Sequence, residues 1–179
     1  MTSRQGIAAE IDWNCAALSD LTSHLVEEHN SRFRVELQIL QELLKEVYVS
    51  YRQRDFARLA PLPGLLFLLR YELDRHMRRE ELTIFPAINA LEKSIESGEE
   101  RKSANRSVGA LISATLLEHD DILDRLVDAR RITGNYDCPS YADQAYRNLF
   151  QRLEALDHDL NLHIRLENDS VFPRALSLA

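Results

Sequence analysis

Apolar side chains recur every three or four positions along four long stretches of the chain, with polar residues between them. This spacing places the apolar positions on one face of an α-helix. Four long helices joined by short connections predict an all-α fold, an antiparallel up-down-up-down four-helix bundle. The predicted helices cover about 18–52, 65–96, 104–132 and, after a cap at 140, a stretch ending near 168.

Helix-breaking residues mark the connections between these helices. Ser19 or Asp20 is expected to cap the first helix, and Ser140 the last. We expect residues 1–16 to form a loose lead-in and residues 17–179 to form the bundle. The connections are 53–64 with Pro61, Pro63 and Gly64, the polar turn 97–101, and the segment from Gly134 to Ser140.

The composition supports one helical domain. With 179 residues and 45% hydrophobic content, the chain is long enough to bury a full-sized core. It has 5 glycines, and this scarcity argues for long helices rather than a β-sandwich or barrel. The formal net charge of −7 gives no basic surface, so we expect neither nucleic acid nor an anionic membrane as a partner.

The remaining bulk signals indicate a cytoplasmic protein. The apolar run at 65–69 is too short to span a bilayer and is followed by Arg70. Residues 1–10 contain no apolar segment of the kind found in signal peptides. Cys15 and Cys138 form no CxxC pair, so no disulfide framework is expected and a reducing compartment fits better.

One pattern of candidate metal ligands occurs twice, at 76–86 and 163–173. Both copies read His-x-Arg-x-Glu-x-x-x-[Ile/Val]-Phe-Pro. Residues four apart share a helix face, so the histidine and the glutamate of each copy point the same way. An imidazole with a carboxylate suits iron, manganese or zinc better than magnesium or calcium. We expect Pro86 and Pro173 to kink or end their helices. The alternative interpretation is a duplicated helix end that binds nothing.

Each of the other two helices carries a histidine on its apolar face, His29 in the first and His119 in the third. His24 and His158 are expected to point outward. Residues that flank a turn symmetrically stand at one height in an antiparallel bundle. His76 with His119, and His119 with His163, meet this condition, and an extended loop at 53–64 can absorb the offset between His29 and His76. Burying two unpaired glutamates would cost roughly several kcal/mol, which two metal ions would offset. The predicted metal ligands are His29, His76, Glu80, His119, His163 and Glu167.

Three segments together carry a resemblance to a known family. They are His76-x-x-x-Glu80 with Phe85-Pro86, then Glu118-His119-Asp120, then the closing stretch 159–176. The order of ligands differs from the Glu-x-x-His of ferritin-like bundles. Over about 20–176 the chain instead resembles hemerythrin-like domains, and within them the iron-centre repair di-iron proteins linked to nitrosative and oxidative stress. The resemblance implies two non-haem iron ions, rather than manganese or zinc, bridged by Glu80 and Glu167, with His76, His119 and His163 as terminal ligands.

The chain departs from this family in two ways. Many members carry an N-terminal domain with cysteines, which we do not find here. The family also places a ligand histidine four residues before an arginine of the first helix, whereas Arg34 is preceded at that offset by Asn30. On a regular α-helix His29 faces inward and Asn30 lies about 100° away, so His29 is the predicted ligand. Asn30 or water is the alternative.

The resemblance implies a stress-response protein that repairs, or supplies iron to, damaged iron–sulfur or iron centres. Open positions on iron bind O₂, NO or peroxide, and iron–sulfur proteins would be macromolecular partners. One alternative is a reversible O₂ or NO carrier or sensor, and another is a metal-free bundle that acts only through partners. We expect Glu36 and Glu72 to be solvated or ion-paired edge residues rather than to serve the metals, and Tyr71 and Tyr146 to pack in the core.

Overall fold

Four helical rods packed side by side form the protein in the computed structural model, which describes residues 13, 15–97 and 104–178. Three rods contain a wide π-turn (η), in which the hydrogen bonds join residues five apart. The first rod consists of α1 (Leu18–His24), η1 (Leu25–Asn30) and α2 (Ser31–Tyr51). The short α3 (Phe56–Leu59) follows, and the second rod consists of α4 (Leu62–Arg79), η2 (Glu80–Ile84) and α5 (Phe85–Ser97). The third rod is α6 (Ala104–Thr133), and the fourth consists of α7 (Gln144–Leu166), η3 (Glu167–Val171) and α8 (Phe172–Leu178).

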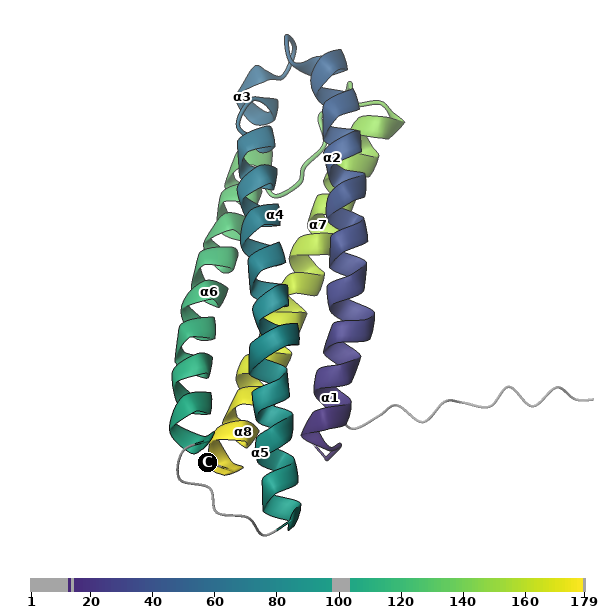
Figure 1. Cartoon of the computed structure of the whole chain (residues 1–179). Coiled ribbons are helices and arrows are strands. Elements are labelled where there is room, and N and C mark those ends of the chain that lie inside the picture. The colour runs from purple at the N-terminus through teal and green to yellow at the C-terminus, as the bar shows by residue number, and fades with distance from the viewer. Residues whose placement is uncertain (1–12, 14, 98–103, 179) are drawn as a thin grey trace, which may run out of the picture.

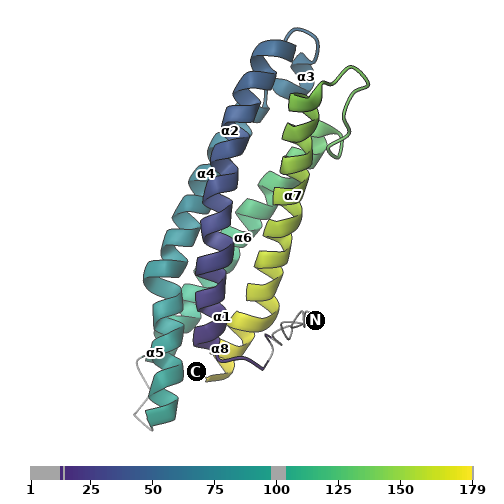
Figure 2. The same cartoon turned by 90° about the vertical axis from the view of Figure 1, so that its right-hand side faces the viewer.

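Successive rods run in opposite directions. Figures 1 and 2 show α3 and the connection between α6 and α7 at one end, and the start of α1 with α5 and α8 at the other. The helix α2 packs against α4 and α7, and α6 packs against the same two helices. The prediction of an antiparallel up-down-up-down bundle is confirmed. The expected turn at 97–101 lies outside the described residues after Ser97, as does most of the expected lead-in.

Several helix ends differ from the expected ones. The helix α4 begins at Leu62 rather than near 65, because Pro63 falls in its first turn, where a missing N–H needs no partner. Asp143, not Ser140, caps α7, and its side chain accepts a hydrogen bond from the Tyr146 N–H. The cap of α1 comes from another rod. The Glu92 carboxylate accepts hydrogen bonds from the N–H groups of Leu18 (2.7 Å) and Ser19 (3.0 Å).

Pro86 and Pro173 were expected to kink or end their helices, and the structure excludes the second of these alternatives. The rods continue beyond both prolines as α5 and α8. The turn before each proline is widened instead, because the N–H of Phe85 bonds the Glu80 carbonyl and that of Phe172 bonds the Glu167 carbonyl. Proline has no N–H and already removes one α-helical hydrogen bond from the preceding turn. A π-turn at this place therefore loses fewer hydrogen bonds than it would elsewhere.

The bundle has two apolar cores with a polar layer between them. The larger core is built from α2, α4, α6 and α7 and includes Leu40, Leu66 and Phe150. The smaller core lies at the end near α1, α5 and α8 and includes Leu21 and Ile88. No described helix is long and apolar enough to cross a membrane.

Two aromatic side chains test the core predictions. Tyr146 is fully buried, and its hydroxyl donates to an Asp55 oxygen at 2.6 Å, as expected of a core residue. Tyr71 is 60% exposed, so its predicted core role is wrong. It lies on the outer face of α4, where apolar Phe67 and Leu68 are exposed as well.

Candidate metal centre

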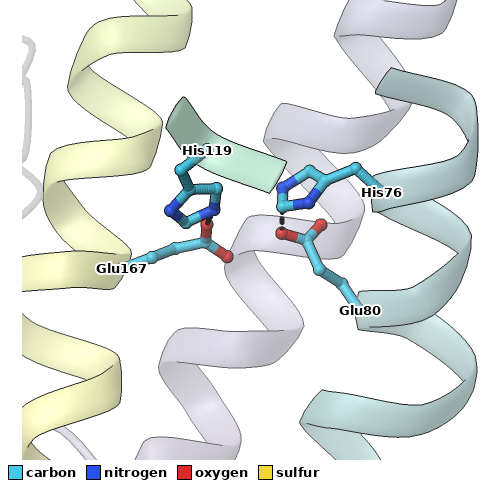
Figure 3. A group of neighbouring side chains, drawn as sticks. All are labelled: His76, Glu80, His119 and Glu167. Atoms are coloured by element: carbon cyan, nitrogen blue, oxygen red, sulfur yellow. Dashed lines mark ion pairs between the residues drawn. The ribbon is translucent and has the colours of Figure 1, made fainter. Parts of the chain in front are cut away.

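Four buried side chains from three rods converge in the polar layer. They are His76 and Glu80 of the second rod, His119 of α6 and Glu167 of the fourth rod. One ligand atom from each lies within 4.8 Å of the others. Figure 3 shows the two imidazoles and two carboxylates pointing into one space. The sequence predicted this convergence from the repeated pattern and from the heights of the histidines.

The nearest atoms in this group are aimed past one another. Nε2 of His76 lies 2.8 Å from Oε1 of Glu80, and Nε2 of His119 lies 3.0 Å from Oε2 of Glu167. Among the described residues, however, none of these four atoms has a partner in hydrogen-bond geometry. In the same part of the chain, Glu80 accepts a hydrogen bond only through its other oxygen, Oε2. Buried polar atoms without partners are rare and costly. Atoms that face a common point, and not each other, are arranged as metal ligands are.

His163 extends the group toward the first rod. Its Nε2 lies 3.8 Å from Oε1 of Glu80 and 3.7 Å from Oε2 of Glu167, so it faces both carboxylates. The imidazole is buried, and neither ring nitrogen has a hydrogen-bond partner among the described residues. It therefore has the position expected of a ligand, one step outside the tight group of four.

Two residues outside the predicted set orient the imidazoles. Nδ1 of His76 lies 3.3 Å from a Glu118 oxygen, and Nδ1 of His119 lies 2.8 Å from the Asn168 amide oxygen. These acceptors hold a proton on Nδ1 and leave each Nε2 free to bind a metal. The sequence pattern indicated neither residue in this role. Each stands next to a predicted ligand in the sequence, but adjacency alone says little about which way a side chain turns.

The first rod places Asn30, not His29, against the group. Asn30 is fully buried, and its Nδ2 donates to Oε2 of Glu80 at 3.0 Å. His29 is half-buried and lies beside His163, with 5.3 Å between the ring centres. The expectation that Asn30 turns away from the core is therefore wrong. Which of the two completes the metal ligands stays a prediction.

The π-turns explain this register. The turn η1 contains both His29 and Asn30, so the angle of 100° per residue that the sequence analysis assumed does not hold there. The turns η2 and η3 begin at Glu80 and Glu167. Three of the four rods thus widen at the polar layer. Such single turns occur often at functional sites, and here they set which side chains face inward.

The buried imidazoles and carboxyls of the layer have pKa values shifted in different directions. Burial alone would lower the pKa of His76, but the Glu80 and Glu118 carboxylates raise it to about 9. Burial likewise opposes ionisation of Glu80, but the positive charge of His76 holds its pKa well below the usual range. Burial and the negative charge of Glu80 raise the pKa of Glu167 well above the usual range. Burial, with the charge of His76, lowers the pKa of His119 to about 4.

This donor set fits a metal ion. Without one, the layer holds a buried imidazolium, a carboxylate and a second glutamate that tends to keep its proton. A divalent cation would satisfy the unpartnered nitrogen and oxygen atoms together, and imidazole with carboxylate is a donor set suited to iron, manganese or zinc.

The remaining candidates have structural roles. Glu36 pairs with Arg152, and Glu72 with Arg125, so the expectation of ion pairs is confirmed. His158 is exposed, as expected. Cys15 and Cys138 are both free thiols.

Comparison with known proteins gives a consistent result. A family model described as the hemerythrin HHE cation binding domain matches residues 21–175. The iron-sulfur cluster repair protein DnrN of Neisseria gonorrhoeae is 28% identical, with 92% of this chain and 95% of that protein covered. Proteins named iron-sulfur cluster repair protein YtfE are 29% identical in Dickeya chrysanthemi and 30% in Musicola paradisiaca. They match over 94% of this chain in both cases, and over 71% and 70% of their own lengths.

Metal binding is predicted to release protons. His76, with its pKa raised to about 9, carries a proton at neutral pH that must leave before Nε2 can bind a metal. The affinity for Mn²⁺ should therefore fall by about tenfold per pH unit for each proton released as the pH is lowered below the pKa of His76. Titration calorimetry in two buffers of different ionisation enthalpy measures the protons released. Equal heats in both buffers would contradict the assignment.

Proposed function

Because this chain belongs to the hemerythrin HHE cation-binding domain family, we propose that its polar layer holds two non-haem iron ions. Glu80, Glu167, His76, His119 and His163 would hold the ions, and His29 or Asn30 would complete the set. The observation that supports it is the set of buried imidazole and carboxylate atoms that face one point without hydrogen-bond partners.

The proposed role is the repair of damaged iron–sulfur or iron centres, or the supply of iron to them, under nitrosative or oxidative stress. Three relatives that match nearly the whole chain carry the name iron-sulfur cluster repair protein. Iron–sulfur proteins are then the partners, and the cytoplasm is the proposed location because such targets and two free thiols suit a reducing compartment.

The protein's own residues prepare the layer for this role. Glu118 and Asn168 fix the rings of His76 and His119, and Arg75 and Arg79 hold Glu118 at 3.3 and 3.1 Å. The two apolar cores limit access of water along the bundle axis. Iron bound there supplies open coordination positions for O₂, NO or peroxide.

One observation favours reversible binding of O₂ or NO as a second candidate function. Glu36 and Glu72, the acids that could have passed protons to a reacting ligand, are held by Arg152 and Arg125. With these two acids immobilised in ion pairs, the site suits a carrier or sensor better than turnover. Spectra recorded during NO addition and removal separate the two, because a carrier returns to its starting spectrum with its iron content unchanged.

Loss of a ligand should lower iron content sharply. We expect His163→Ala and Glu167→Ala each to lower the iron bound per chain by half or more, roughly the loss of one of two ions. His24→Ala and His158→Ala should retain wild-type iron content. Metal analysis after removal of loose iron makes the comparison. Equal iron content in all four variants would contradict the assignment.

A second pair of variants identifies the residue that completes the ligands. If His29 is a ligand, His29→Ala loses iron and Asn30→Ala retains it, and the reverse holds if Asn30 is one. Because Asn30 touches Glu80, Asn30→Asp serves as a control that keeps the size of the side chain. Iron content and the absorption spectrum are measured for each.

Repair activity is tested on an iron–sulfur dehydratase that NO has inactivated. The iron-loaded protein should restore its activity at least about tenfold faster than the same amount of free ferrous iron, because a bound ion is delivered without loss to water and oxidants. Glu167→Ala should lose the effect, and His158→Ala should keep it. Recovery no faster than with free iron would contradict the proposed function.

A further inference from the structure

A line of aromatic rings connects the polar layer with the surface beside α1. The Trp13 and His24 rings stack with 4.3 Å between their centres. The His24 and His29 rings lie 5.3 Å apart, and the His29 and His163 rings also lie 5.3 Å apart. His163 in turn faces Glu80 and Glu167. Three successive imidazoles therefore lead from the surface to the two carboxylates.

The π-turn creates this line. On a regular α-helix, residues 24 and 29 would lie about 140° apart, and the sequence analysis accordingly expected His24 to point away. The turn η1 covers Leu25–Asn30, and its hydrogen bonds join residues five apart. This spacing brings His24 beside His29, so the expectation that His24 lies on the opposite side of the helix from His29 is wrong.

The outer end of the line opens into an acidic hollow. A surface cavity of about 320 Å³ is lined by His24 and by the carboxylate-bearing residues Asp20, Glu27 and Glu28. Arg174 donates to the backbone carbonyls of Trp13 and Ala16 at the edge of the hollow, so three carboxylates outweigh one guanidinium. A hollow with a net negative charge concentrates positive ions. This one attracts cations.

On two other sides of the layer, arginines in ion pairs stand where the first rod has imidazoles. Toward α6, Arg75 and Arg79 surround Glu118 behind His76. Toward α4, Arg34 lies against Glu81 next to Asn30, with 2.9 Å between their nearest atoms. Arg32 does lie near His29, but it pairs with Asp159 at 2.9 Å. Of these sides, only the line of imidazoles provides a cation with neutral nitrogen ligands and with the acidic hollow at its outer end.

Unpartnered nitrogen atoms lie along the line. Nδ1 of His29 and both ring nitrogens of His163 are buried without hydrogen-bond partners among the residues described. His163 is 2% exposed. A bare cation in an apolar core is strongly unfavourable, whereas a chain of imidazoles lets an ion exchange one nitrogen ligand for the next.

We propose that His24 and His29 form a transit site through which a ferrous ion passes between the acidic hollow and His163. This inference rests on the proposed function, because it assumes that the layer holds iron. The ion moves as Fe²⁺ without change of oxidation state. At each step one imidazole or water ligand replaces another. The transit site is thus a route by which iron is loaded and released, in addition to the ligands that hold the resident iron.

Release kinetics test the transit site. In His24→Phe the ring remains but both nitrogens are lost, so iron content at equilibrium should match the wild type. Release of iron to a coloured ferrous chelator should slow by about tenfold, which corresponds to a barrier higher by about 1.4 kcal/mol. His158→Phe, an exposed histidine on α7, is the matched control and should release iron at the wild-type rate.

Loading kinetics give a second measurement that does not depend on the ring. The double variant Glu27→Gln with Glu28→Gln should take up Fe²⁺ several-fold more slowly than the wild type, and the difference should shrink at high salt. Glu42→Gln with Glu46→Gln removes the same charge from the exposed face of α2 and should have no such effect. Circular dichroism verifies that each variant is folded.

The outcomes separate this inference from the function on which it rests. Wild-type release and loading rates in the His24 and Glu27/Glu28 variants, with iron still bound, would overturn the transit site and leave the proposed function standing. A wild-type protein that binds no iron would overturn the proposed function and the transit site together.

Discussion

The structure depends on the burial of two carboxylates and three imidazoles between two apolar cores. Glu80 and Glu167 are fully buried, and burial of like charges at close range is strongly unfavourable. The surrounding cores, Leu40 and Phe150 on one side and Ile88 on the other, supply the apolar contacts that hold the rods together. The apolar cores thus stabilise the bundle, whereas the buried polar layer between them does not. Such a polar layer is expected where a fold carries function.

The backbone adapts to this layer as much as the side chains do. An α-helix has about 3.6 residues per turn, so two neighbouring residues point about 100° apart. The π-turn in the first rod lets Asn30 touch Glu80 while His29 touches His163. In the second and fourth rods the widened turns lie between a glutamate and a proline, where the helix already lacks a hydrogen bond. The Phe-Pro end of the repeated pattern therefore marks a widened turn and not a helix end.

The sequence predicted most of the fold and the centre of the site for physical reasons. Helical periodicity and the position of Gly134 define rods that the structure confirms. The four-residue spacing of His76 and Glu80 holds because the chain between them is regular α-helix and the π-turn begins only at Glu80. The errors share one cause. His24, His29 and Asn30 were placed with the geometry of a regular helix, and a π-turn has no strong local sequence signal. Tyr71 was misplaced because apolar residues also cover the outer face of α4.

The imidazoles of the layer are not equivalent, and the difference bears on what the site can do. His76 and His119 each have an outer acceptor, Glu118 and Asn168, that fixes the ring. No described residue bonds either nitrogen of His163. A ligand without such support binds its metal less firmly, typically by about 10- to 100-fold. A protein that only stores iron has no use for this weakness, whereas one that supplies iron must hold at least one ion loosely. His163 lies on the side of the layer that leads through His29 to the acidic hollow, so in the proposed site the weaker ligand would stand where the access route begins.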